Sequence, residues 1–525
     1  MNHPNSKSMR CLAVFWTSCL FVLSACGGTE DLAPETGEVA SPLNTGYWAN
    51  VTKTFPRTPT GHVVGIGRHN SYVQTESTSS ANLTKTNAKL QLAIDANADL
   101  IEFDVKEEGG RVYVHHEDDG STNGALLVNV LDYASLKADD SVLYIEIKET
   151  STYSSIARQM LDMLRARRTW YARDGRPVVF RSFYARRAGL SAIQALLPEY
   201  PDLSPYIRFH VFLQDSQAAD MLTFHGLIQD AKTQGWHGVE FPYDSTNLLS
   251  KIAYAKSLGL GVALWTIPVS MGEVYLSNLR EEVDAFVCDY DVAKARAVVS
   301  DANQLLYMSV WNQPASGTSI RYYRTGATAY TVPVNVAGAP TTMTDGAGED
   351  RYGTSLVFSA PSAQSLPFYD ADTATGQGFF VSAYINLDDL LTTCPGGASS
   401  CTMALLNKAE AGGFGLELYR SSQGSRVLRF GVYVGGGYQY ATVPLDGLNG
   451  TNGYLITGSY DGNGAVRLWV DNSSAGTTPT ASFTGGVQNT DVPVMGGADP
   501  QASGAPRFFL SAKVQMLQVL RWAGH

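Results

Sequence analysis

Three carboxylate residues in two short apolar runs are placed to share a bound ion. Glu102 and Asp104 are two residues apart within the run 100–105, so on a strand both side chains point to the same side. Glu146 lies in a second run, 142–147. If these runs form neighbouring strands, three carboxylates converge, and their repulsion raises their pKa values unless a cation lies among them. Carboxylate oxygens of this kind predict a hard divalent ion, Mg²⁺ or Ca²⁺.

A simpler interpretation competes with the metal site. Glu102 or Glu146 could form only a salt bridge with Lys148 or with another cation at a strand end. For any one of these residues alone, the salt bridge is the better interpretation. Their joint placement favours a metal, which would bind a phosphoryl oxygen and stabilise negative charge in a transition state.

Two histidines flank the carboxylates and are candidates for proton transfer. His69 follows the first apolar run, and His116 lies just after the run 112–114. With one histidine on each side of a phosphodiester, one can deprotonate the attacking hydroxyl and the other can protonate the leaving alkoxide. His115 and His116 point to opposite sides of a strand, so only one of them can face the site. We take His69 and His116 as the candidate pair, and His115 stays open as the alternative to His116.

The elements that must position these residues alternate between strands and helices from residue 62 to residue 298. This alternation predicts a parallel sheet closed into a (β/α)₈ TIM barrel, in which reactive residues gather at the carboxyl ends of the strands. An open doubly wound sheet is disfavoured because no glycine-rich phosphate loop and helix follow the first strand. The predicted strands are 62–67, 100–105, 142–147, 178–183, 209–213, 238–242, 261–267 and 285–288. The predicted helices are 87–96, 153–167, 190–197, 217–233 and 247–257.

After residue 301 the sequence changes to short alternating strands separated by Gly, Ser, Thr and aromatic residues. This pattern predicts an all-β antiparallel jelly-roll sandwich. The predicted strands are 379–385, 403–406, 415–419, 427–434, 439–443, 454–460, 466–470 and 508–519. Their order resembles the laminin-G-like domain of concanavalin A type, a resemblance that implies a glycan- or surface-binding module. A sandwich without a ligand is equally compatible with the pattern.

The N-terminus predicts export. Lys7 and Arg10 precede an apolar stretch, 12–23, that is too short to span ~30 Å of hydrocarbon comfortably. Residues 23–26, Leu-Ser-Ala-Cys, resemble a bacterial lipobox, which implies that Cys26 carries the lipid anchor. An ordinary secretory signal is the alternative. The expected location is the outer membrane or the cell surface.

Net charge and cysteine positions limit the kinds of partner and site that the sequence allows. The net charge of -11 without a Lys/Arg run argues against nucleic-acid binding. Cys394 and Cys401 bracket a turn-rich loop that can close a small disulfide in an oxidising compartment. Cys288 lies in an apolar run and predicts a core residue, and no Cys/His spacing suggests zinc.

Six successive motifs resemble those of the phosphatidylinositol phospholipase C-like phosphodiesterases, and of the glycerophosphodiester phosphodiesterases most closely. The motifs are ADLIEFDV at 98–105, VHHED at 114–118, LYIEIK at 143–148, FRSF at 180–183, GVALWT at 261–266 and VCDY at 287–290. The resemblance implies that Glu102, Asp104 and Glu146 bind the metal and that His69 and His116 are the acid/base pair. It further implies that Lys148 contacts phosphate and that Trp265 lines the pocket.

This sequence departs from the family after the first strand. The usual His-Arg-Gly is here His69-Asn70-Ser71, which resembles the opening of a phosphatidylinositol-specific phospholipase C, where the Asn can join the metal shell. The phosphate-binding Arg is therefore missing from its usual place, and Arg68 or Arg181 can substitute. We choose His116 over His115 because the acidic Glu117 follows it, where the family has Asp.

We therefore expect an exported, metal-dependent phosphodiesterase that acts on glycerophosphodiesters or phospholipid head groups. The alternative is a surface adhesin or glycan-binding lipoprotein with an inactive barrel. A glycosidase with paired carboxylates is weaker, because it leaves the two histidines without a role. The predicted organisation is a signal over 1–26, a tether over 27–60, the barrel over 61–302, a linker with the first sandwich strands over 303–372, and the sandwich over 373–525.

Overall fold

The computed structural model describes most of the chain after residue 45. The described residues are 46–73, 79–116, 124–270, 272–369, 371, 378–387, 391–394, 397–410, 412–471, 473–477, 487–488 and 490–521. The predicted signal, Cys26 and the first part of the predicted tether lie outside the described residues. So does Glu117, on which the choice of His116 rested. Residues 43–525 form one compact unit.

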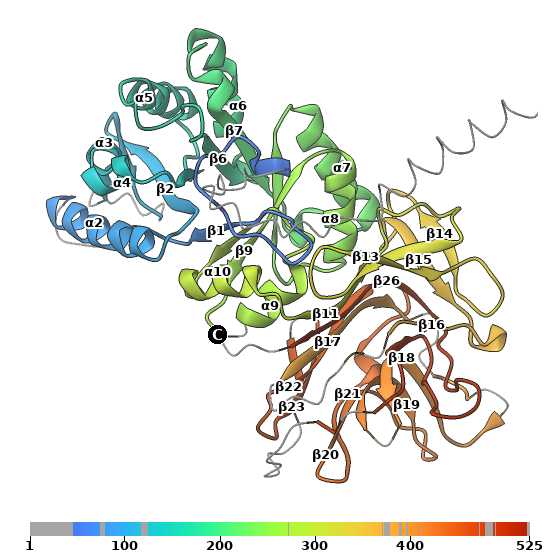
Figure 1. Ribbon diagram of the computed structural model, residues 1–525. Coiled ribbons are helices and arrows are strands. Elements are labelled where there is room, and N and C mark those ends of the chain that lie inside the picture. The colour runs from blue at the N-terminus through green and yellow to red at the C-terminus, as the bar shows by residue number, and fades with distance from the viewer. Residues whose placement is uncertain are drawn as a thin grey trace, which may run out of the picture. The chain divides into compact units, whose positions relative to one another are not determined.

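Eight parallel strands close into a barrel, as the sequence predicts (Figure 1). Pairing between β1 and β2 completes the ring, and the antiparallel strands β3 (Arg111–Val114) and β4 (Ala125–Leu126) extend it beside β2. The barrel strands are β1 (Gly65–Arg68), β2 (Leu100–Glu108), β5 (Val142–Ile147), β6 (Val178–Phe183), β7 (Ile207–Phe212), β8 (Gly238–Pro242), β9 (Gly261–Ile267) and β10 (Ala285–Cys288). They are apolar because a barrel strand is covered by helices outside and by other strands' side chains inside.

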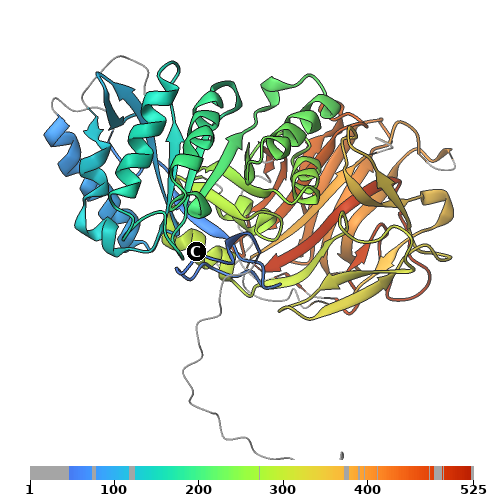
Figure 2. The same ribbon diagram turned by 90° about the horizontal axis from the view of Figure 1, so that it is seen from above.

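Helices connect the strands and lie outside the ring (Figures 1 and 2). They are α2 (Ser79–Asp95), α3 (Leu127–Leu131), α4 (Ala134–Ala138), α5 (Tyr153–Arg165), α6 (Ala188–Leu196), α7 (Met221–Thr233), α8 (Leu248–Ser257), α9 (Gly272–Leu279) and α10 (Val292–Ser300). None of the helices in the described part of the chain is long and apolar enough to cross a membrane.

Two helix starts differ from the predictions by more than two residues. α2 begins eight residues before the predicted residue 87, because its early buried positions, Asn82 and Thr86, are polar and do not show in a hydrophobic pattern. α7 begins at Met221 rather than at residue 217, because the Asp220 side chain accepts a hydrogen bond from the Thr223 amide and caps the helix there.

The segment before β1 closes the amino-terminal end of the barrel. Trp48 and Phe55 are almost completely buried and pack with Leu100 and Val142 from the barrel strands. The Trp48 indole N–H donates to the carbonyl of Asp284 at 2.6 Å. The last part of the predicted tether therefore forms the floor of the barrel interior.

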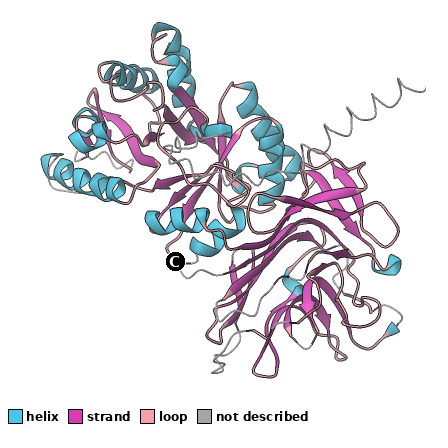
Figure 3. Ribbon diagram, in the orientation of Figure 1, coloured by secondary structure: helices cyan, strands magenta, loops and turns pink. Residues whose placement is uncertain are grey.

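The C-terminal part is an antiparallel sandwich (Figure 3). One sheet contains β11 (Gln304–Ser309), β12 (Ser319–Tyr323), β13 (Ala329–Pro333), β14 (Thr341–Asp345), β15 (Gly353–Phe358), β17 (Phe379–Asn386), β22 (Gly453–Tyr460), β23 (Val466–Val470), β24 (Ser473–Thr477) and β26 (Ala512–Arg521). The other contains β16 (Leu366–Pro367), β18 (Cys401–Ala409), β19 (Gly413–Arg420), β20 (Arg426–Val434), β21 (Gly437–Pro444) and β25 (Met495–Gly496). Apolar side chains of both sheets share one core. A disulfide joins Cys394 and Cys401, and the Cys288 thiol is buried.

Barrel and sandwich are joined by side-chain contacts. Val274 of α9 packs with Phe380, Trp469 and Leu520 of the sandwich in a small buried apolar cluster. Beside it, the Asn278 amide donates to the Thr457 hydroxyl at 2.8 Å.

Candidate active site

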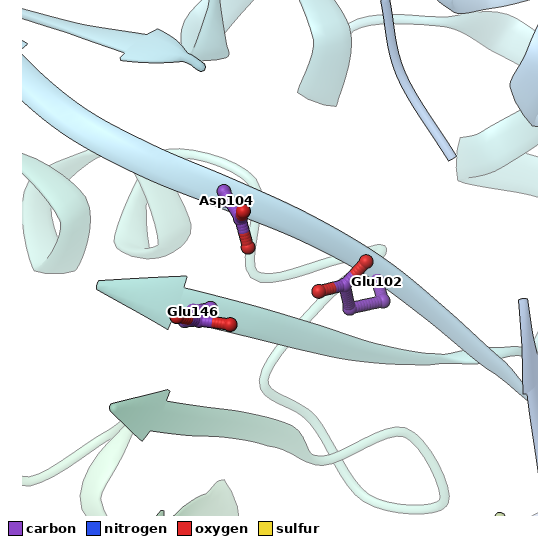
Figure 4. A group of neighbouring side chains, drawn as sticks. All are labelled: Glu102, Asp104 and Glu146. Atoms are coloured by element: carbon purple, nitrogen blue, oxygen red, sulfur yellow. The ribbon is translucent and has the colours of Figure 1, made fainter. Parts of the chain in front are cut away.

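The three carboxylates predicted to share an ion do come together. Glu102 and Asp104 lie on β2, Glu146 lies on the adjacent strand β5, and the register pairs Asp104 with Glu146 (Figure 4). One carboxylate oxygen from each lies within 4.8 Å of the others. All three residues are at most 5% exposed. The strand period of two, together with the pairing of β2 with β5, aims them into the barrel interior near the carboxyl ends of the strands.

The donor set fits a divalent cation. Asp104 Oδ1 is a buried oxygen with no hydrogen-bond partner among the described residues. Burial and the neighbouring Glu102 raise the pKa of Asp104 to about 6, and burial and Asp104 raise the pKa of Glu146 to about 7. Such shifts arise where carboxylates lack enough positive charge. A bound Mg²⁺ or Ca²⁺ would supply that charge through oxygen ligands.

Lys148 is part of this cluster. Its ammonium lies 2.5 Å from Glu146 Oε1 and 3.4 Å from Asp104 Oδ2. Burial by itself would lower the pKa of Lys148, but Asp104 and Glu146 raise it, so the side chain stays charged. The predicted contact between Lys148 and a substrate phosphate therefore has to coexist with these ion pairs.

Arg181 lies deeper in the barrel and pairs with two carboxylates. Its guanidinium is 2.8 Å from Glu240 Oε2 and 3.4 Å from Glu102 Oε1, and the residue is 2% exposed. Among the described residues of this part of the interior, four carboxylates, three from the cluster and Glu240, face the two cationic side chains Lys148 and Arg181. The carboxylates outnumber these two cations, and a divalent ion would supply the missing positive charge.

Arg181 belongs to a polar chain that sequence reasoning missed. Nδ1 of His210 lies 3.0 Å from Glu240 Oε1 and 2.8 Å from the Tyr144 hydroxyl. His210 Nε2 is 2.5 Å from the hydroxyl of Tyr47, in the segment that closes the barrel floor. A chain of polar contacts therefore runs from the floor to Glu102. Glu240 and His210 alternate with apolar residues on their strands. That alternation was the sequence signal that could have placed both side chains inside the barrel.

His69 stands beside the cluster with a carboxylate partner. Its Nδ1 is 2.8 Å from Asp289 Oδ1, which leaves Nε2 for a substrate. Burial by itself would lower the pKa of His69, but the hydrogen bond to Asp289 and the charges of Glu102, Asp289 and Asp104 raise it. Asp289 follows β10, and its partner role was not predicted.

Asn70 has a left-handed backbone, with φ of 48°, and its amide N–H donates to Glu102 Oε2 at 2.6 Å. Its side-chain Oδ1 is buried without a hydrogen-bond partner among the described residues. Asn70 therefore orients one candidate metal ligand through its backbone and holds an oxygen that is available as a further ligand, as its predicted role requires.

The side chains of His115 and His116 lie in different surroundings, as their alternation along a strand predicts. His116 Nε2 lies 3.8 Å from Asp104 Oδ2, and the side chain is 36% exposed. His115 is completely buried, and its amide donates to the Asp104 carbonyl. Tyr72, which was not predicted, donates its hydroxyl to Asp104 Oδ2 at 2.8 Å.

Aromatic side chains form one wall of the barrel mouth. Trp265 contacts Phe183 and Phe212, with ring centroids 5.9 and 5.7 Å away. The Lys148 ammonium lies over Phe183, 5.3 Å from the ring centre. Trp265 thus lies near the cluster, on the side where the predicted pocket wall would be.

Comparison with known proteins gives matches only among solved structures. Glycerophosphodiester phosphodiesterases are among them. The enzyme from Thermotoga maritima is 20% identical over 44% of this chain and 97% of that chain, with a TM-score of 0.29. The enzyme from Agrobacterium tumefaciens is 15% identical over 44% of this chain and 100% of that chain, with a TM-score of 0.30. The binding domain of Paraclostridial Mosquitocidal Protein 1 is 11% identical over 42% of this chain and 50% of that chain, with a TM-score of 0.30. No family model and no curated protein matches the chain.

Proposed function

We propose that the barrel hydrolyses phosphoric diesters with the help of a divalent metal ion. The observation that carries this proposal is the buried cluster of Glu102, Asp104 and Glu146 with His69 and His116 beside it. A metal held by these carboxylates would supply positive charge to a phosphoryl oxygen and stabilise the transition state. A paired-carboxylate glycosidase would not require either histidine.

The protein side chains divide the proton transfers between them. His69 has a raised pKa and stays protonated to a higher pH than an ordinary histidine, so it suits protonation of the leaving alkoxide. Asp289 holds its ring through Nδ1. His116, the more exposed of the two, takes the proton from the attacking nucleophile. That nucleophile is water in direct hydrolysis, or a neighbouring substrate hydroxyl where a cyclic phosphate forms first and water then opens it. Lys148 orients the phosphate.

We further propose that the substrate is a glycerophosphodiester or a phospholipid head group and that the chain is an exported lipoprotein anchored through Cys26. The lipobox resemblance supports the anchor, which would keep the barrel near membrane-derived substrates at the outer membrane or cell surface. In the same proposal the sandwich is a laminin-G-like domain. Its ligand is independent of the reaction in the barrel.

Phosphodiester cleavage after metal removal and readdition tests the proposal. Residues 43–525, which form one compact unit, are assayed on bis(p-nitrophenyl) phosphate, glycerophosphocholine and phosphatidylinositol, with EDTA, Mg²⁺ or Ca²⁺. Turnover that EDTA abolishes and one metal restores is expected. Glu102→Gln should lower turnover by at least about 100-fold, because the charge of one metal ligand is lost.

Glu199→Gln serves as the matched control, because that carboxylate forms a surface pair with Arg158 and its side chain is 54% exposed. It should leave turnover unchanged. A folded protein that cleaves none of the three substrates under any metal condition would contradict the proposed function and favour the adhesin alternative.

A further inference from the structure

The two oxygens of the Asp104 carboxylate have different surroundings. Oδ2 accepts a hydrogen bond from the Tyr72 hydroxyl at 2.8 Å, and the Lys148 ammonium lies 3.4 Å from the same oxygen. His116 Nε2 is 3.8 Å from Oδ2 as well. Oδ1 is buried and has no hydrogen-bond partner among the described residues. The protein therefore holds one oxygen of Asp104 and leaves the other free to bind a ligand.

Tyr72 makes the closest of these contacts to Oδ2, and its ring is held in place. The residue is completely buried and packs in the apolar core of the barrel. Lys148, by contrast, lies closer to Glu146 than to Asp104, and the His116 side chain is 36% exposed. The carboxylate of Asp104 cannot turn about its last side-chain bond without losing the hydrogen bond from Tyr72. Tyr72 is therefore the residue that decides which oxygen of Asp104 stays free.

The other two carboxylates of the cluster are held in a similar way (Figure 4). The Asn70 amide N–H donates to Glu102 Oε2 at 2.6 Å, and the Lys148 ammonium lies 2.5 Å from Glu146 Oε1. Glu102 Oε1 has a longer contact, 3.4 Å, with Arg181. Each of the three carboxylates thus has one oxygen close to a protein donor and offers chiefly the other oxygen to a cation.

Mg²⁺ and Ca²⁺ use carboxylates differently. Mg²⁺ requires nearly octahedral geometry with ligands at about 2.0–2.1 Å, and it keeps several waters. Ca²⁺ takes about 6–8 oxygens at about 2.3–2.6 Å, and carboxylates that bind through both oxygens help to supply them. Three carboxylates that each offer one oxygen leave open positions, which Mg²⁺ fills with water. The arrangement of donors around the cluster therefore favours the smaller ion.

We propose that Tyr72 is a positioning residue that restricts Asp104 to binding through one oxygen and thereby makes the cluster selective for Mg²⁺ over Ca²⁺. Without the Tyr72 hydroxyl, Asp104 can turn and present both oxygens to the larger ion. The inference rests on the proposed metal-assisted phosphodiesterase. It concerns metal binding alone, so the inference and the proposed function can fail separately.

Metal competition followed by electron paramagnetic resonance tests this selectivity. Residues 43–525 are titrated with Mn²⁺, and the bound Mn²⁺ is then displaced with Mg²⁺ or with Ca²⁺. In the unaltered protein the Kd for Ca²⁺ should exceed the Kd for Mg²⁺ by about tenfold or more. Tyr72→Phe should reduce this ratio by about tenfold, because it releases Asp104 Oδ2 and keeps the buried ring.

Tyr171→Phe is the matched control. Tyr171 is also completely buried, and its hydroxyl donates a hydrogen bond of the same length, 2.8 Å, to the Leu131 carbonyl. The control should leave the affinities for both ions unchanged. If Tyr72 had only a structural role, Tyr72→Phe would weaken Mg²⁺ and Ca²⁺ binding equally, and the ratio of the two Kd values would not move.

The proposal is overturned if the unaltered protein binds no Mn²⁺, if Ca²⁺ displaces Mn²⁺ at least as well as Mg²⁺ does, or if Tyr72→Phe leaves the ratio unchanged. The first two outcomes need no variant, so they decide the matter even if Tyr72→Phe does not fold. Selective Mg²⁺ binding without cleavage of any phosphodiester would contradict the proposed function alone. Phosphodiester cleavage by a protein that binds both ions equally would contradict this inference alone.

Discussion

Among single residues, Asp289 has the most direct influence on the acid/base pair. It raises the pKa of His69 through a 2.8 Å contact from the end of β10. A raised histidine pKa keeps the ring protonated to a higher pH, and the general acid is lost as the pH rises through that pKa.

Asp289→Asn is therefore expected to move the alkaline limb of the pH profile of kcat to lower pH. The amide keeps a hydrogen-bond partner but removes the negative charge that favours protonated His69. The pH profile and the NMR titration of the His69 ring provide the measurement. An alkaline limb at the same pH as in the unaltered protein would mean that His69 is not the general acid.

Protons and metal should compete for the carboxylate cluster. The pKa values of Asp104 and Glu146 are raised to about 6 and about 7, and only the ionised carboxylates bind a cation well. Mn²⁺ affinity, followed by electron paramagnetic resonance, should therefore be full above about pH 7 and fall steadily as the pH drops through 7 and 6. Equal affinity at pH 5 and pH 8 would argue against this cluster as the binding site.

At the scale of elements, β6, β7 and β8 place the buried Arg181, His210 and Glu240 side by side across the barrel. The ion pair between Arg181 and Glu240 lies inside the barrel, where an unpaired charge is costly. The pair also helps to position Glu102, because Arg181 contacts the carboxylates of both Glu240 and Glu102.

Glu240→Ala should lower the free energy of unfolding by about 3–5 kcal/mol, because it leaves the buried Arg181 with only its long contact to Glu102. Urea denaturation measures this loss. Glu199→Ala, which breaks an exposed pair with Arg158, should give no measurable change. If the two substitutions had equal effects, the buried chain would have no special role in stability.

At the scale of the whole compact unit, barrel and sandwich share buried contacts. Val274 from the barrel side and Phe380 from the sandwich side meet in one apolar cluster, and Asn278 bonds to Thr457 beside it. Such contacts couple the unfolding of two bodies when they are buried and apolar.

Residues 43–525 should therefore unfold in a single calorimetric transition. Phe380→Asp places an unpaired charge in the shared cluster and should split the transition into two or lower its midpoint by several degrees. Tyr330→Asp, at an exposed position of the sandwich, is the control and should leave one transition. Two transitions in the unaltered protein would show that barrel and sandwich unfold independently.

The local periodicity of the sequence was enough to predict the fold class and the shared orientation of Glu102 and Asp104. A strand period of two places Glu102 and Asp104 on one side whatever their surroundings, and alternating strands and helices imply parallel pairing. The barrel and the antiparallel sandwich are confirmed by the strand pairing. Both features depend on residues close together in the sequence.

The other contacts of the candidate site were decided by the closure of the barrel, which brings together residues that are far apart in the sequence. His69 meets Asp289 across 220 positions of sequence, because the ring closes with β1 beside β10. Tyr47 meets His210 across 163 positions, because the segment before β1 lies across the amino-terminal end of the barrel. Arg68 and Arg181 were the two candidates for the missing phosphate-binding Arg, and nothing in the sequence indicated that the Arg181 guanidinium lies between Glu102 and Glu240. No local pattern contains such pairings, since they depend on which inward side chains share a layer once the barrel has closed.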